Sequence, residues 1–169
     1  MTIKVGDKVP GGKLSESAGW DDATSCPMPP KDVDVAEATK GKRVAIFALP
    51  GAYTPTCSAK HVPSYLSNYD ALKQKGLDEI WCVATNDGFV MGAWGRDQKG
   101  LGKIRFLGDG SGLWTKALGL ELDLTARGMG TRSQRYSMLV EDGTVKQLNI
   151  EGPGKFEVSG GDTILKQLG

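Results

Sequence analysis

The segment Pro50-Gly-Ala-Tyr-Thr-Pro-Thr-Cys57-Ser58 separates two differently patterned parts of the chain. Before it, residues 44–49 are all apolar, which is typical of a strand that is covered on both faces. After it, apolar residues recur at helical spacing, at Val62, Leu66, Tyr69 and Leu72. The segment itself is rich in the glycine and proline that mark turns. The sequence therefore predicts a buried strand, a tight turn and a helix, in that order.

Cys57 falls in the first turn of this predicted helix. Thr54 and Pro55 form a helix start signal, because a hydroxyl that can cap the helix precedes a proline at the first helical position. The unpaired N–H groups and the positive end of the helix dipole in such a turn favour an anion. Since the thiolate is the reactive form of cysteine, we expect Cys57 to be a reactive thiol rather than a buried structural cysteine.

Length, charge and cysteine content narrow the class of protein. The chain has 169 residues, which predicts one domain spanning 1–169. With 21 Lys+Arg against 20 Asp+Glu, nothing indicates nucleic acid or a membrane surface as a partner. No apolar run is long enough to span a bilayer and no signal peptide pattern opens the chain, so we expect a cytoplasmic protein. Three cysteines without a Cys-x-x-Cys pattern indicate neither a disulfide framework nor a zinc site.

The rest of the pattern predicts an α/β fold with a central mixed β-sheet flanked by helices. Strands are expected at 43–49, 79–84, 104–107, 136–140 and 144–150, the last two joined by a turn at Asp142-Gly143. Helices are expected near 33–41, 58–75, 86–94, 111–118 and 162–168, with Pro63 bending the second and Asp162 capping the last. The region around Cys26 and the stretch 127–130 are expected to be loops. This order of elements matches a thioredoxin-type core.

Thioredoxins carry Cys-x-x-Cys at the start of the first core helix, whereas this chain has Thr54-x-x-Cys57. A hydroxyl in place of the partner thiol rules out a dithiol cycle within the motif. A single activated thiolate beside a hydroxyl suits reaction with a small oxidant, which yields a sulfenic acid. Thr54 would orient that oxidant by hydrogen bonding.

Residues 49–63 closely resemble the active-site segment of type II peroxiredoxins, the peroxiredoxin-five group. The resemblance continues in 86–94, 117–121 and 135–143, in the family's order, and covers most of the chain. It implies a thiol-dependent peroxidase of thioredoxin-like fold that reduces hydrogen peroxide and alkyl hydroperoxides. No cofactor or metal is implied, because sulfur carries the electrons.

The resemblance also assigns roles to residues. Cys57 matches the peroxidatic cysteine, Thr54 the threonine that hydrogen-bonds thiolate and peroxide, and Pro50 the proline that shields the pocket from water. Arg135 matches the arginine that holds the thiolate and stabilises charge on the peroxide oxygens. Arg132 is a rival three residues earlier, expected to lie farther from the sulfur.

How the sulfenic acid would be reduced stays open. Cys82 resembles the second cysteine of plant and bacterial members, but a buried strand residue is an equal alternative. Cys26 resembles the resolving cysteine of some fungal members. The late cysteine of some animal members is absent, because residues 156–159 read Phe-Glu-Val-Ser. If neither thiol reaches Cys57, an external thiol reduces it, either glutathione with glutaredoxin or thioredoxin.

Three aromatic residues and the single histidine each allow two interpretations. The family often forms homodimers, and Phe89, Trp94 and Trp114 are candidates for the interface or for the core. His61, one helical turn after Cys57, could indicate a cysteine hydrolase, but no orienting Asn or Asp can be assigned and a scaffold role is favoured. A redox sensor without turnover is the remaining alternative.

Overall fold

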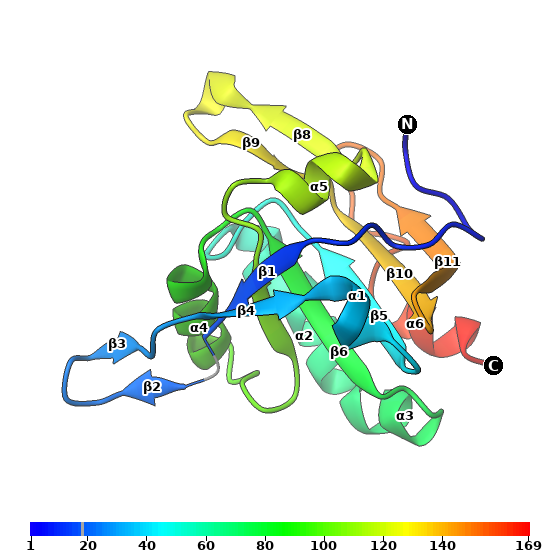
Figure 1. Ribbon diagram of the computed structural model, residues 1–169, viewed down its shortest axis with the longest axis horizontal. Helices are drawn as coiled ribbons and strands as arrows, with labels where there is room; N and C mark the ends of the chain where they lie inside the picture. The colour runs from blue at the N-terminus through cyan, green and yellow to red at the C-terminus, as the bar shows by residue number, and fades with distance from the viewer. Residues whose placement is uncertain (18) are drawn as a thin grey trace.

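A seven-stranded mixed sheet forms the centre of the computed structural model, which describes residues 1–17 and 19–169 (Figure 1). The strand order is β11-β10-β5-β6-β7-β1-β4. Strands β5, β6 and β7 run parallel to one another, whereas β10, β11, β1 and β4 join them by antiparallel pairing. This arrangement confirms the predicted α/β fold with a central mixed sheet.

The strands of the large sheet are β1 (Lys13–Glu16), β4 (Lys31–Asp34), β5 (Arg43–Ala48), β6 (Glu79–Ala84), β7 (Arg105–Gly108), β10 (Tyr136–Glu141) and β11 (Thr144–Ile150). Two small hairpins lie outside it, β2 (Trp20–Asp21) with β3 (Cys26–Pro27) and β8 (Glu121–Leu124) with β9 (Gly130–Ser133). The helices are α1 (Val35–Thr39), a π-helix (Cys57–His61), α2 (Val62–Ser67), α3 (Tyr69–Gln74), α4 (Gly88–Asp97), α5 (Leu113–Leu118), a 3-10 turn (Thr125–Arg127) and α6 (Gly161–Gln167).

Both faces of the sheet are covered, which explains the unbroken apolar run at 44–49. Alternate residues of β5 point to opposite faces. Phe47 packs toward α2, α3, α4 and α6, while Ile46 packs toward α1, α5 and the N-terminal segment. Every residue from Val44 to Leu49 is fully buried, as expected of a central strand between two helical layers.

The turn at Asp142-Gly143 joins β10 to β11 as predicted. Both residues have positive φ, 47° at Asp142 and 77° at Gly143, the backbone of a tight hairpin turn. The pairing sets Tyr136 opposite Ala48, so the start of β10 lies beside the end of β5. This register positions the residues that precede β10 next to the turn that follows β5.

Several details of the predicted elements were wrong. The helix expected over 58–75 is divided into the π-helix, α2 and α3. Residues 57–61 form a wider turn, α2 begins at Val62 with Pro63 in its first turn, and Asn68 departs from helical geometry before α3. The loop expected at 127–130 is largely confirmed, because residues 125–129 connect β8 to β9 and only Gly130 of that stretch belongs to a strand. The last helix is preceded by Gly160, so Asp162 lies within its first turn instead of capping it.

The structure corrects the expectation for Cys26 and decides between the two alternatives that were open for Trp94 and Trp114. Cys26 lies in the short strand β3 rather than in a loop, where it pairs with Asp21. Trp94 and Trp114 are core residues, only 0% and 2% exposed, so neither can contribute to a surface patch. Phe89, by contrast, is 50% exposed and does not share the buried side of α4.

Within the described ranges 1–17 and 19–169, none of the helices has the length and apolar character needed to cross a bilayer.

Candidate active site

The end of β5 and the start of β10 bring together two of the predicted site residues. Pro50 follows β5 and Arg135 precedes β10, and the pairing of Ala48 with Tyr136 makes these two ends neighbours. Pro50, Thr56 and Arg135 line one cavity of about 350 Å³. The register of the sheet therefore joins residues that are far apart in the chain.

The turn between β5 and the helical segment that contains Cys57 is held by short polar contacts. The backbone N–H of Ala52 donates to Asn86 Oδ1 at 2.8 Å, and the Thr54 hydroxyl donates to the Gly51 carbonyl at 2.7 Å. The helix begins at Pro55, as predicted. The predicted cap is wrong, however. The Thr54 hydroxyl donates back into the turn, to Gly51, and does not accept a hydrogen bond from an N–H of the helix.

Arg132, the rival to Arg135, braces this same turn. Its guanidinium donates to the carbonyl of Met129 at 2.8 Å and to that of Pro50 at 3.1 Å. A Cβ on Gly51 would lie 2.5 Å from Arg132 Nη1, so a larger residue at this position would displace the guanidinium. Arg132 thus supports the backbone around the site.

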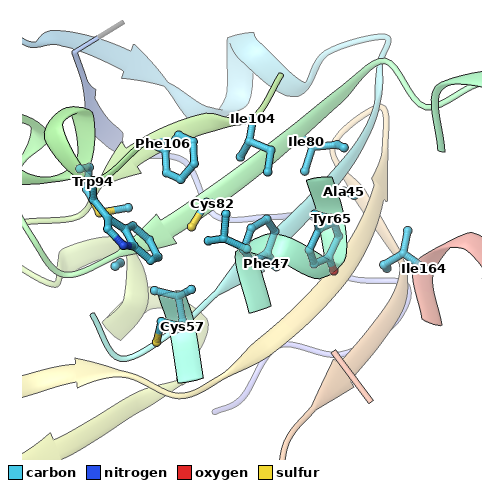
Figure 2. Close-up of a cluster of buried hydrophobic side chains, with 14 of the residues drawn as sticks. Ala45, Phe47, Cys57, Tyr65, Ile80, Cys82, Trp94, Ile104, Phe106 and Ile164 are labelled. Carbon is cyan, nitrogen blue, oxygen red and sulfur yellow. The ribbon is translucent and has the colours of Figure 1, made fainter. Parts of the chain in front are cut away.

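Cys57 begins the π-helix, in which its carbonyl accepts from the N–H of Val62, five residues later. Single π-turns of this kind are frequently found at functional sites. Cys57 and His61 are both fully buried at the two ends of this turn. Figure 2 shows Cys57 at the margin of the buried cluster that contains Phe47, Tyr65 and Trp94.

Arg135 connects Cys57 and His61 through one guanidinium. Its Nη2 donates to Cys57 Sγ at 3.2 Å, and its Nη1 donates to His61 Nδ1 at 2.9 Å. A fixed positive charge at hydrogen-bond distance stabilises a thiolate over a thiol. The rigid planar fork of arginine holds both contacts at once in a fixed geometry, which the compact ammonium of a flexible lysine does not provide.

The partners of His61 define its protonation. Its Nε2 lies 3.0 Å from the Ser159 carbonyl, which can only accept, so Nε2 carries the proton and Nδ1 offers a lone pair to Arg135. Burial, and next the positive charge of Arg135, lower the pKa of His61 from 6.5 to about 3. A neutral imidazole with both nitrogens engaged cannot serve as a base toward Cys57. The cysteine hydrolase alternative is therefore not favoured.

The three cysteines lie in different surroundings and all are free thiols. Cys82, in β6, is fully buried in the same cluster as Cys57, and the sulfur of Cys57 points away from it in Figure 2. Burial, and next the nearby Cys57, raise the pKa of the Cys82 thiol well above its usual value. Cys26 is exposed on the β2–β3 hairpin, which extends from the body of the molecule in Figure 1.

Sequence reasoning missed three residues that surround this centre, namely Tyr65, Glu151 and Ser159. The Ser159 carbonyl accepts from the Tyr65 hydroxyl at 2.8 Å as well as from His61, and Glu151 binds the backbone around Ser159. No local pattern could have indicated Glu151 and Ser159, because they meet the site from the residue after β11 and from the loop before α6. Tyr65 lies in α2, one helical turn after His61.

Comparison with known proteins agrees with this geometry. The Redoxin family matches residues 4–165. Peroxiredoxin-2B of Arabidopsis thaliana is 45% identical over 166 residues, which cover 98% of each chain. The crystal structure of reduced Prx3 from Vibrio vulnificus in complex with H2O2 is 43% identical, with a TM-score of 0.90, covering 99% of this chain and 100% of that one.

A third chain, from Burkholderia cenocepacia, is 51% identical with a TM-score of 0.92 over 98% of both chains, and is described as a putative thioredoxin reductase. That description differs from those of the curated relatives, which are named peroxiredoxins and match this chain over 98% of its length. The peroxidase interpretation is supported, and that of a sensor without turnover is not favoured. The chain belongs to the Redoxin family and, within it, to the type II peroxiredoxins, which makes it a thiol-dependent peroxidase of thioredoxin-like fold.

Proposed function

We propose that Cys57 is the peroxidatic cysteine of this enzyme. Its thiolate attacks one oxygen of the peroxide, an S–O bond forms, and the O–O bond breaks. The sulfur loses two electrons and becomes a sulfenic acid, while the other oxygen leaves as hydroxide or alkoxide and takes up a proton to give water or an alcohol. The observation that carries this assignment is the 3.2 Å contact between Arg135 Nη2 and Cys57 Sγ.

Arg135 acts twice in this step. Before reaction its guanidinium stabilises the thiolate, and during reaction the same donors face the negative charge that moves onto the leaving oxygen. The hydrogen bond to His61 keeps the fork in place, so little reorganisation is needed when the charge moves. An arginine that is already fixed before the substrate arrives lowers the barrier more than a mobile one.

Peroxide would reach the sulfur from the cavity lined by Pro50, Thr56 and Arg135. The side chain of Cys57 is fully buried at rest, so only a small oxidant admitted past Pro50 meets it. The oxygen of Thr54 has free lone pairs, since its proton is donated to Gly51. It would accept a hydrogen bond from the peroxide hydroxyl and orient the oxygen that is attacked.

An external thiol would restore Cys57, either glutathione with glutaredoxin or thioredoxin. Two observations support this over an internal disulfide. Burial keeps Cys82 protonated, whereas attack on a sulfenic acid needs a nucleophilic thiolate. Cys26 sits on the separate β2–β3 hairpin. The two cysteines nevertheless stay the internal candidates that an experiment should test.

A homodimer completes the proposal. Two large side chains near the site are about half exposed, Tyr53 at 54% in the active-site turn and Phe89 at 50% in α4. Exposed aromatic side chains are favoured in protein interfaces. Sedimentation of Phe89→Glu beside the unchanged protein tests this, since a charge in a dimer interface should shift the protein to monomers.

The test of the peroxidatic role is peroxide turnover with dithiothreitol as reductant. Cys57→Ser should abolish turnover while far-UV circular dichroism stays unchanged, and Cys26→Ser and Cys82→Ser are the matched controls. Mass spectrometry after one equivalent of hydrogen peroxide then identifies a sulfenic acid on Cys57 or a disulfide with its partner. Unchanged turnover in Cys57→Ser would refute the proposal.

A further inference from the structure

Glu151 is a buried carboxylate with an unusually complete set of donors. It follows β11 and is only 8% exposed. Its Oε2 accepts from the backbone N–H groups of Glu157, Val158 and Ser159 at 2.8, 2.9 and 2.9 Å and from the Ser159 hydroxyl at 2.7 Å. Its Oε1 accepts a further contact from Glu157 N at 2.9 Å. The carboxylate therefore folds residues 157–159 around itself.

Ionisation is essential to this contact. Burial alone would raise the pKa of Glu151, but the hydroxyl of Ser159 and the three backbone N–H groups outweigh it and hold the pKa below its usual value. A neutral glutamine amide would present its own NH₂ group to some of these donors and could not accept from all of them. The ionised carboxylate of Glu151 can therefore accept all the hydrogen bonds that residues 157–159 offer, and a neutral amide cannot.

The bound turn presents the Ser159 carbonyl to the active site. That carbonyl accepts from His61 Nε2 at 3.0 Å and from the Tyr65 hydroxyl at 2.8 Å. Because it occupies Nε2–H, it leaves the Nδ1 lone pair of His61 facing Arg135. A displaced Ser159 carbonyl would release the imidazole to rotate or to change tautomer, and Arg135 would lose its acceptor.

A second contact ties Glu151 to Arg135 through the backbone. The N–H of Glu151 donates to the carbonyl of Arg135 at 3.0 Å, across the ends of β10 and β11. Glu151 thus holds the main chain of Arg135 directly and its guanidinium through Ser159 and His61. The backbone contact does not depend on the side chain of Glu151, so substitution tests the side-chain route alone.

We propose that Glu151 is a positioning residue for the peroxidase reaction, acting through Ser159 and His61 on the guanidinium of Arg135. The inference rests on the proposed roles of Cys57 and Arg135. It adds a carboxylate that is separated from the sulfur by three intervening residues and takes no part in bond making.

The experiment measures the second-order rate constant for oxidation of Cys57 by hydrogen peroxide in the reduced full-length protein. Glu151→Gln should lower it roughly 3- to 30-fold, the range expected for a group that acts through intermediates. Glu157→Gln is the matched control, because it makes the same chemical change at an exposed side chain of the same turn, and it should leave the rate within twofold. Circular dichroism and thermal melting verify that each variant is folded.

A double-mutant cycle separates positioning from a general structural effect or from direct contact with peroxide in the cavity that Glu151 also lines. Introduced into His61→Leu, Glu151→Gln should have little further effect, because the route to Arg135 is already interrupted. A wild-type rate in Glu151→Gln, or equal losses in both backgrounds, would overturn the proposal.

If Glu151→Gln does not fold, Ser159→Ala, which removes one of the carboxylate's donors, takes its place in the same cycle. Turnover in Cys57→Ser would instead refute the proposed function itself.

Discussion

Arg135 Nη2 lies 3.2 Å from Cys57 Sγ, although 78 residues separate them in the chain. The contact arises because Tyr136 pairs with Ala48, which carries Arg135 to the end of the strand that precedes Cys57. The same guanidinium is held by His61, and His61 by the Ser159 carbonyl. The reactive sulfur is therefore connected through Arg135 and His61 to the Ser159 carbonyl by three successive hydrogen bonds.

Replacing Arg135 should weaken the reaction with peroxide far more than it weakens the fold. Arg135→Met removes the donors that face the developing negative charge, so the rate constant for Cys57 oxidation should fall by roughly 10² to 10³. Arg135→Lys should recover only part of it, because a flexible ammonium lacks the rigid fork that holds His61 and Cys57 in a fixed geometry. Stopped-flow measurements with Arg127→Met, which removes a positive charge from an exposed position, as control would check this. A similar loss in the control would contradict the assignment.

Acid should destabilise the protein through His61. The folded pKa of about 3 lies below the ordinary 6.5, so the unfolded chain takes up the proton first. The contribution of neutral His61 to the free energy of unfolding is fully present above pH 6.5 and is lost as pH falls toward 3. Between pH 6.5 and 5.0 the free energy of unfolding should fall by about 2 kcal/mol. Urea denaturation at several pH values measures this slope.

His61→Leu provides the control for this slope, because His61 is the only histidine in the chain. Glu79 titrates at lower pH: burial would raise its pKa, but hydrogen bonds led by that from Lys42 bring it to about 2. Its contribution is present above pH 4.5 and is lost below that value. The variant should therefore show a nearly flat stability between pH 6.5 and 5.0. An unchanged slope would show that another group titrates there.

Tyr53 connects the active-site turn to α4 and should limit access to Cys57. It adopts a left-handed backbone, with φ at 60°, and its hydroxyl donates to Asp97 Oδ2 at 2.7 Å. Tyr53→Phe removes the hydrogen bond and favours opening of the strained turn. Labelling of Cys57 by a bulky aromatic disulfide should become roughly 2- to 10-fold faster, as the net value of one hydrogen bond implies. Tyr69→Phe, which removes a hydroxyl from α3, should leave the labelling rate unchanged.

The two other cysteines should differ sharply in reactivity. Iodoacetamide at pH 8 should modify exposed Cys26 within minutes, whereas burial and a raised pKa should protect Cys82 until the protein unfolds. Peptide mass spectrometry of native and urea-denatured protein distinguishes them. Rapid native modification of Cys82 would mean that β6 opens readily, and would return Cys82 to the internal reductants worth considering.

Local pattern accounts for the elements that carry the site. The apolar run at 44–49, the turn at Asp142-Gly143 and the helix start at Pro55 follow from burial, positive φ and proline chemistry, each of which involves only neighbouring residues. The division of the 58–75 helix was missed, because a π-turn differs from an α-turn by one hydrogen-bonding register. The role of Arg135 required the family resemblance, since an arginine beside a strand is usually solvated.

The sequence by itself determined a buried strand leading to a cysteine at the start of a helix, within a mixed α/β fold. Only the tertiary structure decided which charges reach that cysteine. It joined Arg135 and His61 to the sulfur, set Glu151 and Ser159 behind them, and placed Trp94 in the core. The physical reason is that helix and turn formation depend on adjacent residues, whereas the field at a buried atom depends on which strand ends and loops meet there.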